Sequence, residues 1–306
     1  SGYTGGGCPG SGTAASESGR YSNETLHYVK LTTAFELQAK ELTQGEWKAV
    51  YPGWNPSGFP NCGDTCPVEQ VSWYDVLAYA NAKSLGAGLS ACYMLTGIEC
   101  EDGTSVALPA DCMTSTRGGI DTATVTLNGA SSPYECTGYR LPTESEWEYA
   151  YRAGGVTAFH TSAGNNGAIT QTERSPLDPN LDQIGWYGGN STETYGGGYG
   201  CSSWFDGATT CGPQPGGGKE ANALGLYDMS GNVWEWCWDW YASTYPAGTV
   251  ASPVQDPSGS GSGSYRVNRG GSWYFYAGSA RGAYRSYNTP GSRDRYLGFR
   301  LARSVP

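Results

Sequence analysis

Arg269-Gly-Gly-Ser-Trp273 and Leu297-Gly-Phe-Arg-Leu301 frame the most informative segment of this chain. The second stretch alternates apolar residues with Gly298 and Arg300, which predicts a half-buried strand. Between the two stretches, Tyr, Ser, Gly and Asn prevail. Tyr offers a large contact area at a low entropy cost, and the small polar residues offer adaptable hydrogen bonds. This mixture is therefore typical of a binding surface.

The positions with this chemistry are the candidate ligand-binding residues. They are Tyr274, Phe275, Tyr276, Gly278, Ser279, Gly282, Tyr284, Ser286, Tyr287, Asn288, Ser292, Asp294, Arg295 and Tyr296. Clustered, exposed aromatic side chains usually mark the contact with a partner. The alternative is a Tyr-rich surface loop that binds nothing.

The composition predicts an α+β fold rich in loops. The 306 residues include 47 glycines and many Trp and Tyr, while only 15% of the residues are charged. Such a chain suits a few short helices, small antiparallel sheets and long irregular segments held by aromatic packing. No apolar run approaches about 18 residues, so we expect no membrane span. The sequence starts without an initiator Met or a signal peptide, as expected of a mature or trimmed form.

The net charge of −10 limits the possible partners. Nucleic-acid binding requires a basic surface that releases counterions from phosphates, so we expect no nucleic-acid partner. Anionic membrane surfaces are disfavoured for the same reason. A local basic patch remains an alternative near the C-terminus. It would comprise Arg266, Arg269, Arg281, Arg285, Arg293, Arg295, Arg300 and Arg303.

Ten cysteines in a Gly-rich acidic chain predict disulfides and an oxidising compartment, and hence a secreted or cell-surface protein. A zinc site is disfavoured because no CxxC pair exists and the two histidines lie far apart in the sequence. Spacing alone leaves the connectivity open. The local pairs that we expect are Cys62–Cys66, Cys92–Cys100 and Cys201–Cys211.

Three capping patterns predict helices. Thr43-Gln-Gly-Glu46 and Thr143-Glu-Ser-Glu146 each place Glu three residues after a Thr N-cap. Ser72-Trp-Tyr-Asp75 begins a further helix, which we expect to end near Gly86. The helix after Thr143 should end at Gly154, where a glycine can take the left-handed conformation that stops a helix.

Strands are predicted at residues 26–38 and at residues 234–240, where four tryptophans alternate and should bury one aromatic face. Long Gly-, Ser-, Thr- and Asn-rich loops are expected at 100–135, 155–180, 187–220 and 245–264. Loops of such length are usually functional or insertions.

We expect residues 1–20 to form a flexible N-terminal segment and residues 21–306 to form a single domain. Within this domain, residues 269–303 are the candidate variable or ligand-binding region. The Ser/Gly run 257–264 looks like a flexible connector. However, only about forty residues follow it, which is too few for a core of their own.

Several motifs together resemble the formylglycine-generating enzyme (sulfatase-modifying factor) family. They span most of residues 20–303 and occur in the family's order. They are Glu41-Leu-Thr-Gln-Gly-Glu-Trp47, Cys66-Pro-Val-Glu-Gln-Val-Ser-Trp-Tyr-Asp75, Gly138-Tyr-Arg-Leu-Pro-Thr-Glu-Ser-Glu-Trp-Glu-Tyr-Ala150, Gly225-Leu-Tyr-Asp-Met-Ser-Gly-Asn-Val-Trp-Glu-Trp236, Arg269-Gly-Gly-Ser-Trp273 and Leu297-Gly-Phe-Arg300. The resemblance implies the family's irregular, loop-rich variant of the C-type lectin fold.

The family's copper chemistry is not expected here. Its enzymes are similar in using two cysteines after the Gly-Gly-Ser motif to hold copper, and Cu(I) needs soft thiolate ligands. The last cysteine of this chain is Cys237, and Phe275 stands where the first ligand would be. We therefore expect no copper, no catalytic residues and no enzyme. His27 and His160 suggest no catalytic base, and the acids Glu144, Glu146 and Glu148 are explained by the N-terminal helix dipole.

A structural Ca²⁺ ion is the one cofactor that the resemblance implies. By position, Asp228 and Glu235 would supply side-chain oxygens, and Gly231 and Val233 would supply backbone carbonyls. Oxygen ligands from a tight, Gly-containing turn suit Ca²⁺. The alternative is that the two acids only cap turns while the neighbouring tryptophans pack in the core.

The candidate region is also similar to the diversified segment of variable proteins from diversity-generating retroelements. In those systems, adenine-directed mutagenesis of AAC codons varies scattered residues while the framework stays fixed. A mutated AAC codon can encode Tyr, Phe, Ser, Gly, Asp, Arg or Asn, but never Lys, Glu, Gln, Met or Trp. Every candidate position obeys this rule. Ordinary non-enzymatic family members also have polar, Asn-rich segments here, so this alternative stays open.

Two function classes follow. The first is a binding protein that recognises a protein or cell-surface ligand, possibly after diversification by a retroelement. Aromatic and Arg side chains are the usual anchors of such a surface. It would present on one face Tyr274, Phe275, Tyr276, Tyr284, Tyr287 and Tyr296, with Asp294 and Arg295 for polar specificity. The second class is an enzyme, either a sulfatase-cysteine oxidase of the family or an unrecognised activity in the family's cleft. A structural module in a larger surface protein is a third option.

Overall fold

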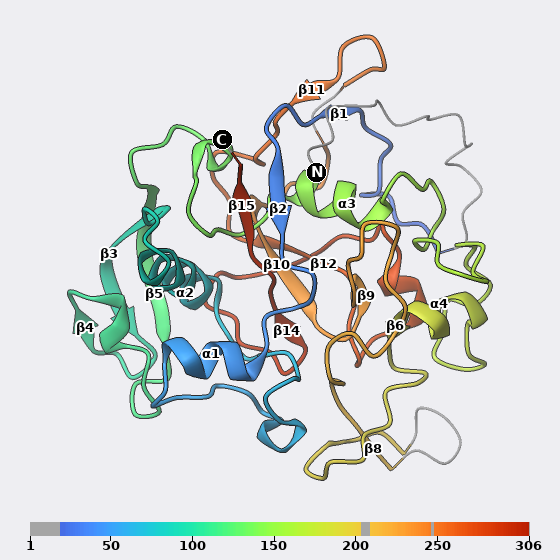
Figure 1. Ribbon diagram of the computed structural model, residues 1–306, viewed down its shortest axis with the longest axis horizontal. Helices are drawn as coiled ribbons and strands as arrows, with labels where there is room; N and C mark the ends of the chain where they lie inside the picture. Colours follow the sequence, from blue (N-terminus) through green and yellow to red (C-terminus); the bar gives the residue numbers. More distant parts are fainter. Residues whose placement is uncertain (1–18, 203–208, 246–247, 306) are drawn as a thin grey trace.

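A four-stranded sheet with the order β13-β12-β10-β14 lies at the centre of the molecule (Figure 1). The computed structural model describes residues 19–202, 209–245 and 248–305. β12 runs antiparallel to both β10 and β13, whereas β14 runs parallel to β10. These strands are β10 (Trp234–Trp240), β12 (Arg266–Arg269), β13 (Ser286–Asn288) and β14 (Leu297–Gly298). The candidate region 269–303 therefore supplies β13 and β14, and β12 ends at its first residue, Arg269. Residues 1–18 of the segment expected to be flexible, including Cys8, lie outside the described residues.

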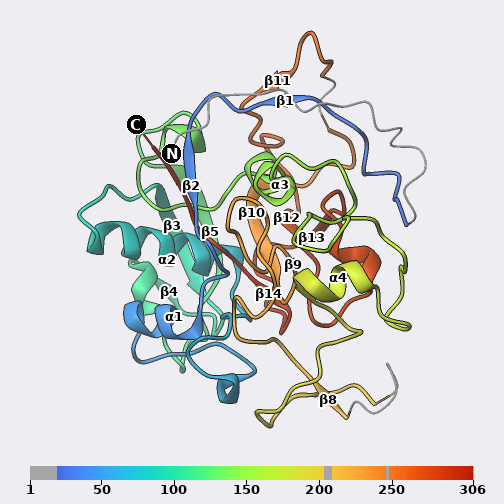
Figure 2. The ribbon, with the colours of Figure 1, turned by 45° about the vertical axis from the view of Figure 1, so that its right-hand side comes forward.

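The three expected helices form with the expected caps. α1 (Gln44–Val50), α2 (Trp73–Gly86) and α3 (Glu144–Arg152) each begin with a complete capping box. A fourth helix, α4 (Pro179–Ile184), was not expected because its six residues lie in a Gly- and Ser-rich stretch. α2 lies on one side of the central sheet and α4 on the other in both views (Figures 1 and 2).

A second sheet overturns part of the loop prediction. β3 (Tyr93–Cys100) pairs with β4 (Ser105–Val106) and β5 (Ile120–Leu127), and β5 lies within the expected loop 100–135. Thr alternates with apolar residues along β5, and the Thr side chains face solvent while Ala123 and Val125 are half-buried. The many Thr residues made this segment look like a polar loop, so its alternation was missed, although Thr is a favourable strand residue.

Four disulfides hold the described loops together. Cys62–Cys66 and Cys201–Cys211 confirm two of the expected pairs. The expected pair Cys92–Cys100 is wrong, because β3 extends between the two residues. At about 3.3 Å per residue, a strand keeps its ends far apart. The actual bonds are Cys92–Cys136 and Cys100–Cys112, and Cys237 is a buried free thiol.

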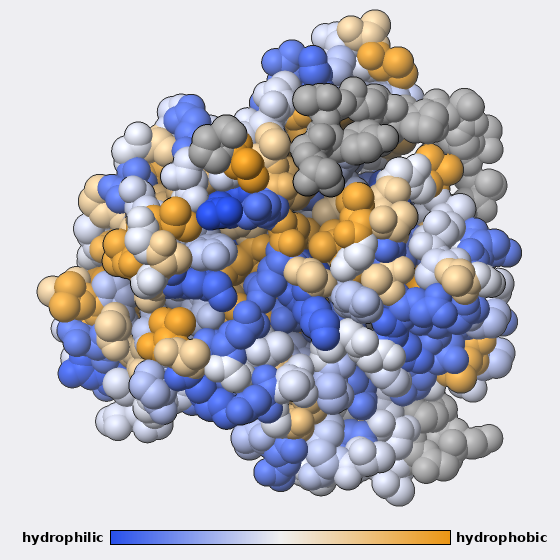
Figure 3. Space-filling model, in the orientation of Figure 1, coloured by the Kyte–Doolittle hydropathy of each residue, from blue (hydrophilic) through white to orange (hydrophobic). Residues whose placement is uncertain are grey.

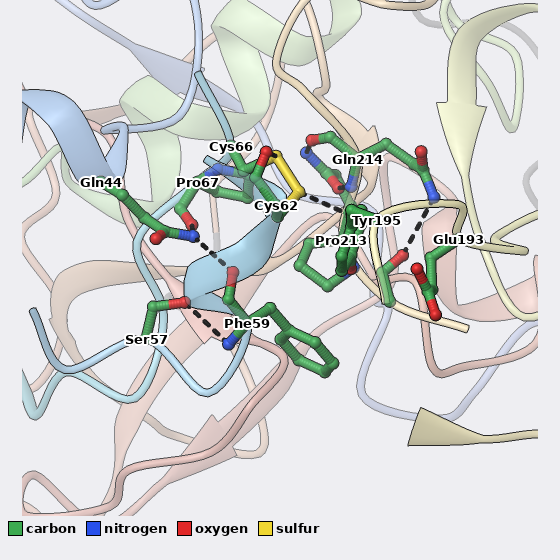
Figure 4. The surroundings of a disulfide bond; sticks show 12 residues. Gln44, Ser57, Phe59, Cys62, Cys66, Pro67, Glu193, Tyr195, Pro213 and Gln214 are labelled. Carbon is green, nitrogen blue, oxygen red and sulfur yellow. Dashed lines mark hydrogen bonds between the residues drawn. A yellow bond between two sulfur atoms is a disulfide. The ribbon is translucent and has the colours of Figure 1, made fainter. Parts of the chain in front are cut away.

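The Cys62–Cys66 loop joins two distant parts of the chain (Figure 4). Cys62 Sγ lies 3.4 Å from the carbonyl oxygen of Pro213. The same oxygen accepts a hydrogen bond from the Tyr195 hydroxyl at 3.0 Å. On the other side of the loop, Gln44 of α1 donates to the Phe59 carbonyl at 3.2 Å. The disulfide loop thereby connects α1 with the chain around Tyr195 and Pro213.

Short paired strands and 3-10 turns complete the fold, which confirms the loop-rich α+β architecture. The strand pairs are β1 (Val29–Lys30) with β11 (Val254–Gln255), β2 (Phe35–Leu37) with β15 (Ala302–Ser304), β6 (Gly185–Trp186) with β9 (Ser230–Gly231), and β7 (Tyr199–Gly200) with β8 (Thr210–Cys211). The turns are η1 (Pro60–Cys62), η2 (Pro109–Asp111), η3 (Pro133–Glu135) and η4 (Ala277–Ala280).

The core strands are more deeply buried than expected. β10 buries Glu235, Cys237 and Asp239 as well as tryptophans, so both of its faces lie in the interior. The prediction of a half-buried strand at 297–301 is also wrong, since Gly298 and Arg300 are buried too. A Cβ at Gly298 would come within 2.5 Å of the Val68 carbonyl oxygen, which explains why a glycine stands there.

Polar and apolar side chains are interspersed over much of the surface in Figure 3, and apolar residues gather near the middle of that face. Among the described residues, no helix combines the length and the apolar character needed to cross a membrane.

Candidate ligand-binding site

The candidate region turns sharply after β12. Gly270 and Gly271 have φ angles of 101° and 79°, and residues with a side chain rarely adopt such backbone angles. A Cβ at Gly271 would lie 2.9 Å from the Ala280 Cα, so the turn packs directly against η4. This close approach fixes where the chain leaves the central sheet and where the candidate residues begin.

The buried side chain of Arg269 holds the backbone of the loop at residues 282–284. It is fully buried and donates to the Gly282 carbonyl at 2.9 Å and to the carbonyls of Ala283 and Tyr284. Its guanidinium also pairs with Glu148 of α3 at 2.6 Å. One side chain therefore fixes the backbone of three successive residues in the candidate region.

Other arginines of the region are likewise buried and paired with acids. Arg281 binds Glu24 through two hydrogen bonds of 2.6 Å, and Arg285 binds Glu144 at 2.6 and 2.7 Å. Bidentate pairs of this kind are the strongest ion pairs in geometry and energy. Arg300 pairs with Glu235, and Arg293 with Asp75. The alternative of a basic surface patch is therefore wrong, because most of these charges are internal.

The acids of α3 form ion pairs with buried arginines in addition to interacting with the helix dipole. Burial alone would raise the pKa of Glu148, but Arg152 and Arg269 overcome this effect and lower the pKa to about 2. The pKa of Glu144 is lowered in the same way, mainly by Arg285. Glu146 closes the capping box and pairs with the buried Arg140 at 2.7 Å. The dipole explanation was incomplete because Arg269 and Arg285, which pair with Glu148 and Glu144, lie far away in the sequence.

On the outer side of the region, aromatic rings form an aromatic patch. We define it as Tyr199, Tyr274, Phe275, Tyr276 and Tyr296. The Tyr296 ring lies 5.5 Å from Tyr274 and 5.1 Å from Phe275, centroid to centroid. The Tyr199 ring lies 5.5 Å from Tyr274. Tyr276 is 45% exposed and Tyr199 is 39% exposed, so the patch offers aromatic surface to solvent.

Arg174 connects the patch with the loop 155–180. Its guanidinium lies 4.3 Å from the centre of the Tyr276 ring and 5.7 Å from that of Tyr274. It also donates to the Tyr274 carbonyl at 2.7 Å. A cation over an aromatic face is attracted by the ring quadrupole. Arg174 thus orients two rings of the patch.

Polar candidates border the patch at Tyr296. Asn268 donates to Asn288 at 2.8 Å, and Asn288 donates to Asp294 at 3.1 Å. Burial raises the pKa of Asp294, while hydrogen bonds from Tyr296 and Asn288 oppose the rise. Arg295 is exposed beside this network. The structure thereby brings Asn288, Asp294, Arg295 and Tyr296 next to the aromatic rings.

The remaining candidates lie elsewhere. Tyr287 is exposed, but its ring packs on Tyr241 at 4.2 Å and on Tyr265 at 4.9 Å. Successive residues of a strand point to opposite faces, so Tyr287 is directed away from Asn288. Tyr284 packs against Tyr21 at 5.1 Å. The structure therefore divides the six expected aromatic residues instead of placing them in one group.

The small candidates differ in exposure. Gly278, Ser279 and Gly282 are buried, so they cannot contact a ligand on the surface. A Cβ at Gly282 would come within 2.4 Å of the Tyr151 ring, which gives this glycine a packing role. Ser286 and Ser292 are partly exposed, and the Ser292 hydroxyl bonds to Thr289 at 2.8 Å.

The candidate calcium ligands do not form a ready acidic cage. Both oxygens of Glu235 bind Arg300, at 2.6 and 2.7 Å, and one also accepts from Trp147 at 2.7 Å. Within the described ranges, no group of three or more Asp, Glu, His or Cys residues is placed to hold a metal. Sequence position alone could not show that Glu235 is the counter-ion of Arg300.

Asp228 nevertheless fits a cation. Its Oδ2 accepts from the Gly217 amide at 2.7 Å, whereas its Oδ1 is buried and has no partner among the described residues. Burial, and to a lesser extent the nearby Glu235, raise the pKa of Asp228 to about 6. Burial, then Asp228 and Glu235, raise the pKa of the neighbouring Glu41 well above its usual value. A cation beside Asp228 Oδ1 would relieve this excess of acid.

Neither histidine has a catalytic environment. His160 is buried, and desolvation lowers its pKa to about 4. The His27 ring stacks on Tyr245 at 3.6 Å, and its Nδ1 lies 3.1 Å from the Thr25 carbonyl oxygen. Phe275 occupies the position of the family's first copper ligand and packs against the buried Trp234 at 5.7 Å.

The fold and the sequence together define the family. The model of the sulfatase-modifying factor enzyme 1-like domain matches residues 6–305, and the chain belongs to this family. The chaperone protein LppX of Paenibacillus barcinonensis is 32% identical over 240 residues, which cover 78% of this chain and 69% of that protein. The formylglycine-generating enzyme of Streptomyces coelicolor is 36% identical over 191 residues, or 58% of this chain. The chain matches only about half, 51%, of that enzyme's length.

A solved structure, Treponema denticola variable protein 1, matches almost the whole chain. The TM-score is 0.68 at 31% identity, and the match covers 93% of this chain and 89% of that one. The expected family and the expected similarity to variable proteins are both confirmed. The relatives include a variable protein and a chaperone as well as enzymes, so family membership alone does not assign an activity.

Sequence reasoning missed Tyr199 of the patch, and it also missed Arg174, which contacts two of the patch rings. Tyr199 and Arg174 lie in the loops 187–220 and 155–180, which were noted only for their length. The sequence held one usable signal, since the Cys201–Cys211 pair predicts that the adjacent Tyr199 is held in place. Nothing local indicates that either residue contacts Tyr274.

Proposed function

We propose that this chain is a ligand-binding protein whose recognition surface is the aromatic patch, with Asp294 and Arg295 at its border. The observation that carries the proposal is that residues 269–300 combine two kinds of side chain with different roles. Buried arginines fix the backbone, while aromatic side chains of the patch remain accessible. The ligand is a folded protein or a cell-surface molecule, and the patch side chains within residues 269–303 vary between copies of the gene by retroelement-directed mutagenesis.

Chemistry and similarity support this proposal. Tyr and Arg are the residues that most often contribute the binding energy of interfaces. Four disulfides among the described residues indicate an oxidising environment, which favours a secreted or surface-displayed protein. The similarity to a variable protein supports the same class. No observation on the described residues favours the alternative of sulfatase-cysteine oxidation.

The proposal is tested with a displayed library. Positions 274, 275, 276, 294, 295 and 296 are varied over the residues that mutated AAC codons encode, and the library is selected against a panel of folded extracellular proteins. We expect specific binders that keep the parent's melting temperature within a few degrees. A matched library at the buried positions 278, 279 and 282 should yield mostly unfolded protein. Binders from neither library would contradict the proposal.

Two further measurements separate the alternatives. A near-identical, Asn-rich repeat beside a reverse transcriptase gene would establish diversification, and its absence would remove that part of the proposal. The purified protein, loaded with copper, should not convert a sulfatase-derived cysteine peptide to formylglycine. Conversion of this peptide would replace the binding function by the enzymatic one.

We also propose that one Ca²⁺ ion binds beside Asp228, with the backbone carbonyls of Gly231 and Val233 as further ligands. The buried, unpaired Asp228 Oδ1 supports this site. A ligand that binds only the folded state at about 100 times its Kd stabilises it by about 2.7 kcal/mol. Calcium should therefore raise the melting temperature of the wild type over that in EGTA, and Asp228→Asn should remove most of the increase. Equal increases in both proteins would exclude Asp228 as a ligand.

A further inference from the structure

A cavity separate from the aromatic patch opens between β1, β11 and the first turn of α3. Its volume is about 210 Å³. An engineered cavity of about 150 Å³ is known to hold benzene, so this space can hold a small organic molecule. Val29, Val254, Pro257 and Trp240 supply apolar wall, and Asp239 and Glu144 supply acid. Figure 1 shows β1 and β11 side by side above α3.

The two acids of this cavity differ in their partners. Glu144 binds Arg285 through both oxygens and also accepts from the Tyr245 hydroxyl at 2.9 Å. Among the residues that the structure describes, Asp239 Oδ2 accepts a hydrogen bond from the Glu144 amide alone, at 2.8 Å. No described residue donates a hydrogen bond to Asp239 Oδ1, and no described Arg or Lys forms an ion pair with this carboxyl. Asp239 is only 4% exposed, so its free oxygen can be reached only through the cavity.

Space beside Asp239 is kept open by a glycine. Gly259 has a φ of +82°, and a Cβ at this position would lie 2.7 Å from the Asp239 Cβ and 3.1 Å from its Oδ1. Any other residue would therefore fill the room next to the carboxyl. A buried acid with an unpaired oxygen, an open space beside it and apolar walls together make a built site.

We propose that this cavity binds a small organic cation, a primary ammonium group on a short apolar or aromatic stem, with Asp239 as its anionic partner. The ammonium group supplies the donors that Asp239 Oδ1 lacks. The stem lies against the apolar wall. The Glu144–Arg285 pair neutralises itself and leaves Asp239 as the uncompensated acid.

The electrostatic environment of Asp239 supports a bound cation. Burial, and then the charge of Glu144, raise the pKa of Asp239 to about 8. The negative charge of Glu144, which is the second cause of this rise, also favours an ammonium ion beside the carboxyl. Among the other basic residues of this region, Arg266 stacks between Trp73 and Trp240, 3.7 and 3.5 Å from their ring centres, and His27 lines the cavity with its ring stacked on Tyr245.

Benzylammonium is a suitable probe, and benzyl alcohol is its neutral analogue of similar shape. Calorimetric titration of the purified chain should give at least about tenfold tighter binding of the cation than of the alcohol, as expected for one charge-assisted hydrogen bond. Asp239→Asn matches the shape of the protonated acid and keeps an acceptor for the Glu144 amide. This variant should bind both compounds equally weakly.

Tyr276→Ser serves as the control, because Tyr276 belongs to the aromatic patch and not to this cavity. It should bind benzylammonium like the wild type. Equal affinity of the wild type for both compounds would overturn the proposal, and this comparison requires no variant. Unchanged benzylammonium binding by Asp239→Asn would also overturn it. Loss of binding in Tyr276→Ser alone would place the amine on the aromatic patch, and the ligand-binding function proposed above would be unaffected by the failure of the cavity site.

Discussion

The framework arginines and the aromatic patch share one segment but meet opposite environments. Arg269, Arg281 and Arg300 are buried and paired with acids from distant parts of the chain. Tyr274 and Tyr276 lie at the surface, and the rings of both contact Arg174. Removing one partner of a buried pair leaves an uncompensated charge, whereas an exposed side chain can change at little cost. The segment can therefore vary its surface without losing its backbone.

The largest effect is expected for Arg269→Ala. This change removes one of the two arginines that pair with Glu148, and it removes the hydrogen bonds from the buried guanidinium to three carbonyls. The free energy of unfolding should fall by about 3–5 kcal/mol. Urea denaturation measures this loss, with the exposed Arg295→Ala as the control, which should change stability by less than about 0.5 kcal/mol. Similar losses in both variants would remove the distinction between framework and surface.

Asp239 is a buried acid that forms no ion pair with a described arginine. Its contribution to the free energy of unfolding should change with pH in the opposite sense to that of Glu148. The pKa of Asp239 is about 8 in the folded chain and near 4 when unfolded, so the stability that it contributes is present at low pH and is lost as the pH rises through 8. Asp239→Asn removes this titration. Between pH 5 and 7, the wild type should lose stability relative to the variant at about 1.4 kcal/mol per pH unit. Urea denaturation at several pH values in this range measures the free energy of unfolding of both proteins. If it changed with pH equally in the wild type and in Asp239→Asn, the raised pKa of Asp239 would be contradicted.

Glu148 provides the matching test at low pH. Its pKa of about 2 lies below the unfolded value, so its contribution is present at neutral pH and is lost as the pH falls toward 2. Glu148→Gln should therefore be less stable than the wild type at pH 7, and the two proteins should converge in acid. A difference that stays constant down to pH 3 would show that Glu148 acts by packing and not by charge.

Phe275 lies between the two classes and should show an intermediate effect. Its ring contacts the buried Trp234 as well as Tyr296 in the patch. Phe275→Ser should lower the free energy of unfolding by about 1–2 kcal/mol, since the ring is partly buried. Thermal unfolding by circular dichroism measures this value. A loss as large as that of Arg269→Ala would show that position 275 belongs to the framework.

Tyr276→Ser should give the smallest change in stability, within about 0.5 kcal/mol, because the side chain is 45% exposed. Binders selected from the library should nevertheless lose affinity with this change. Thermal unfolding and binding are measured on the same protein preparation. A large loss of stability would mean that the contact with Arg174 is structural.

Local sequence was sufficient for elements whose cause is local. The capping boxes at Thr43, Ser72 and Thr143 depend on residues three positions apart, and all three helices begin as expected. The Cys62–Cys66 and Cys201–Cys211 bonds close short loops for the same reason. The ordered motifs also sufficed for the family and its loop-rich fold.

Tertiary structure alone decided which residues meet across the chain. Cys92 bonds to Cys136 because β3 carries Cys100 away from it. Tyr287 leaves the group of aromatic candidates because the register of β13 directs it toward Tyr241. Such contacts depend on pairing between distant segments, which no local pattern encodes. Composition determined that this region is rich in Tyr, Ser and Gly, and packing determined which of its side chains reach the surface.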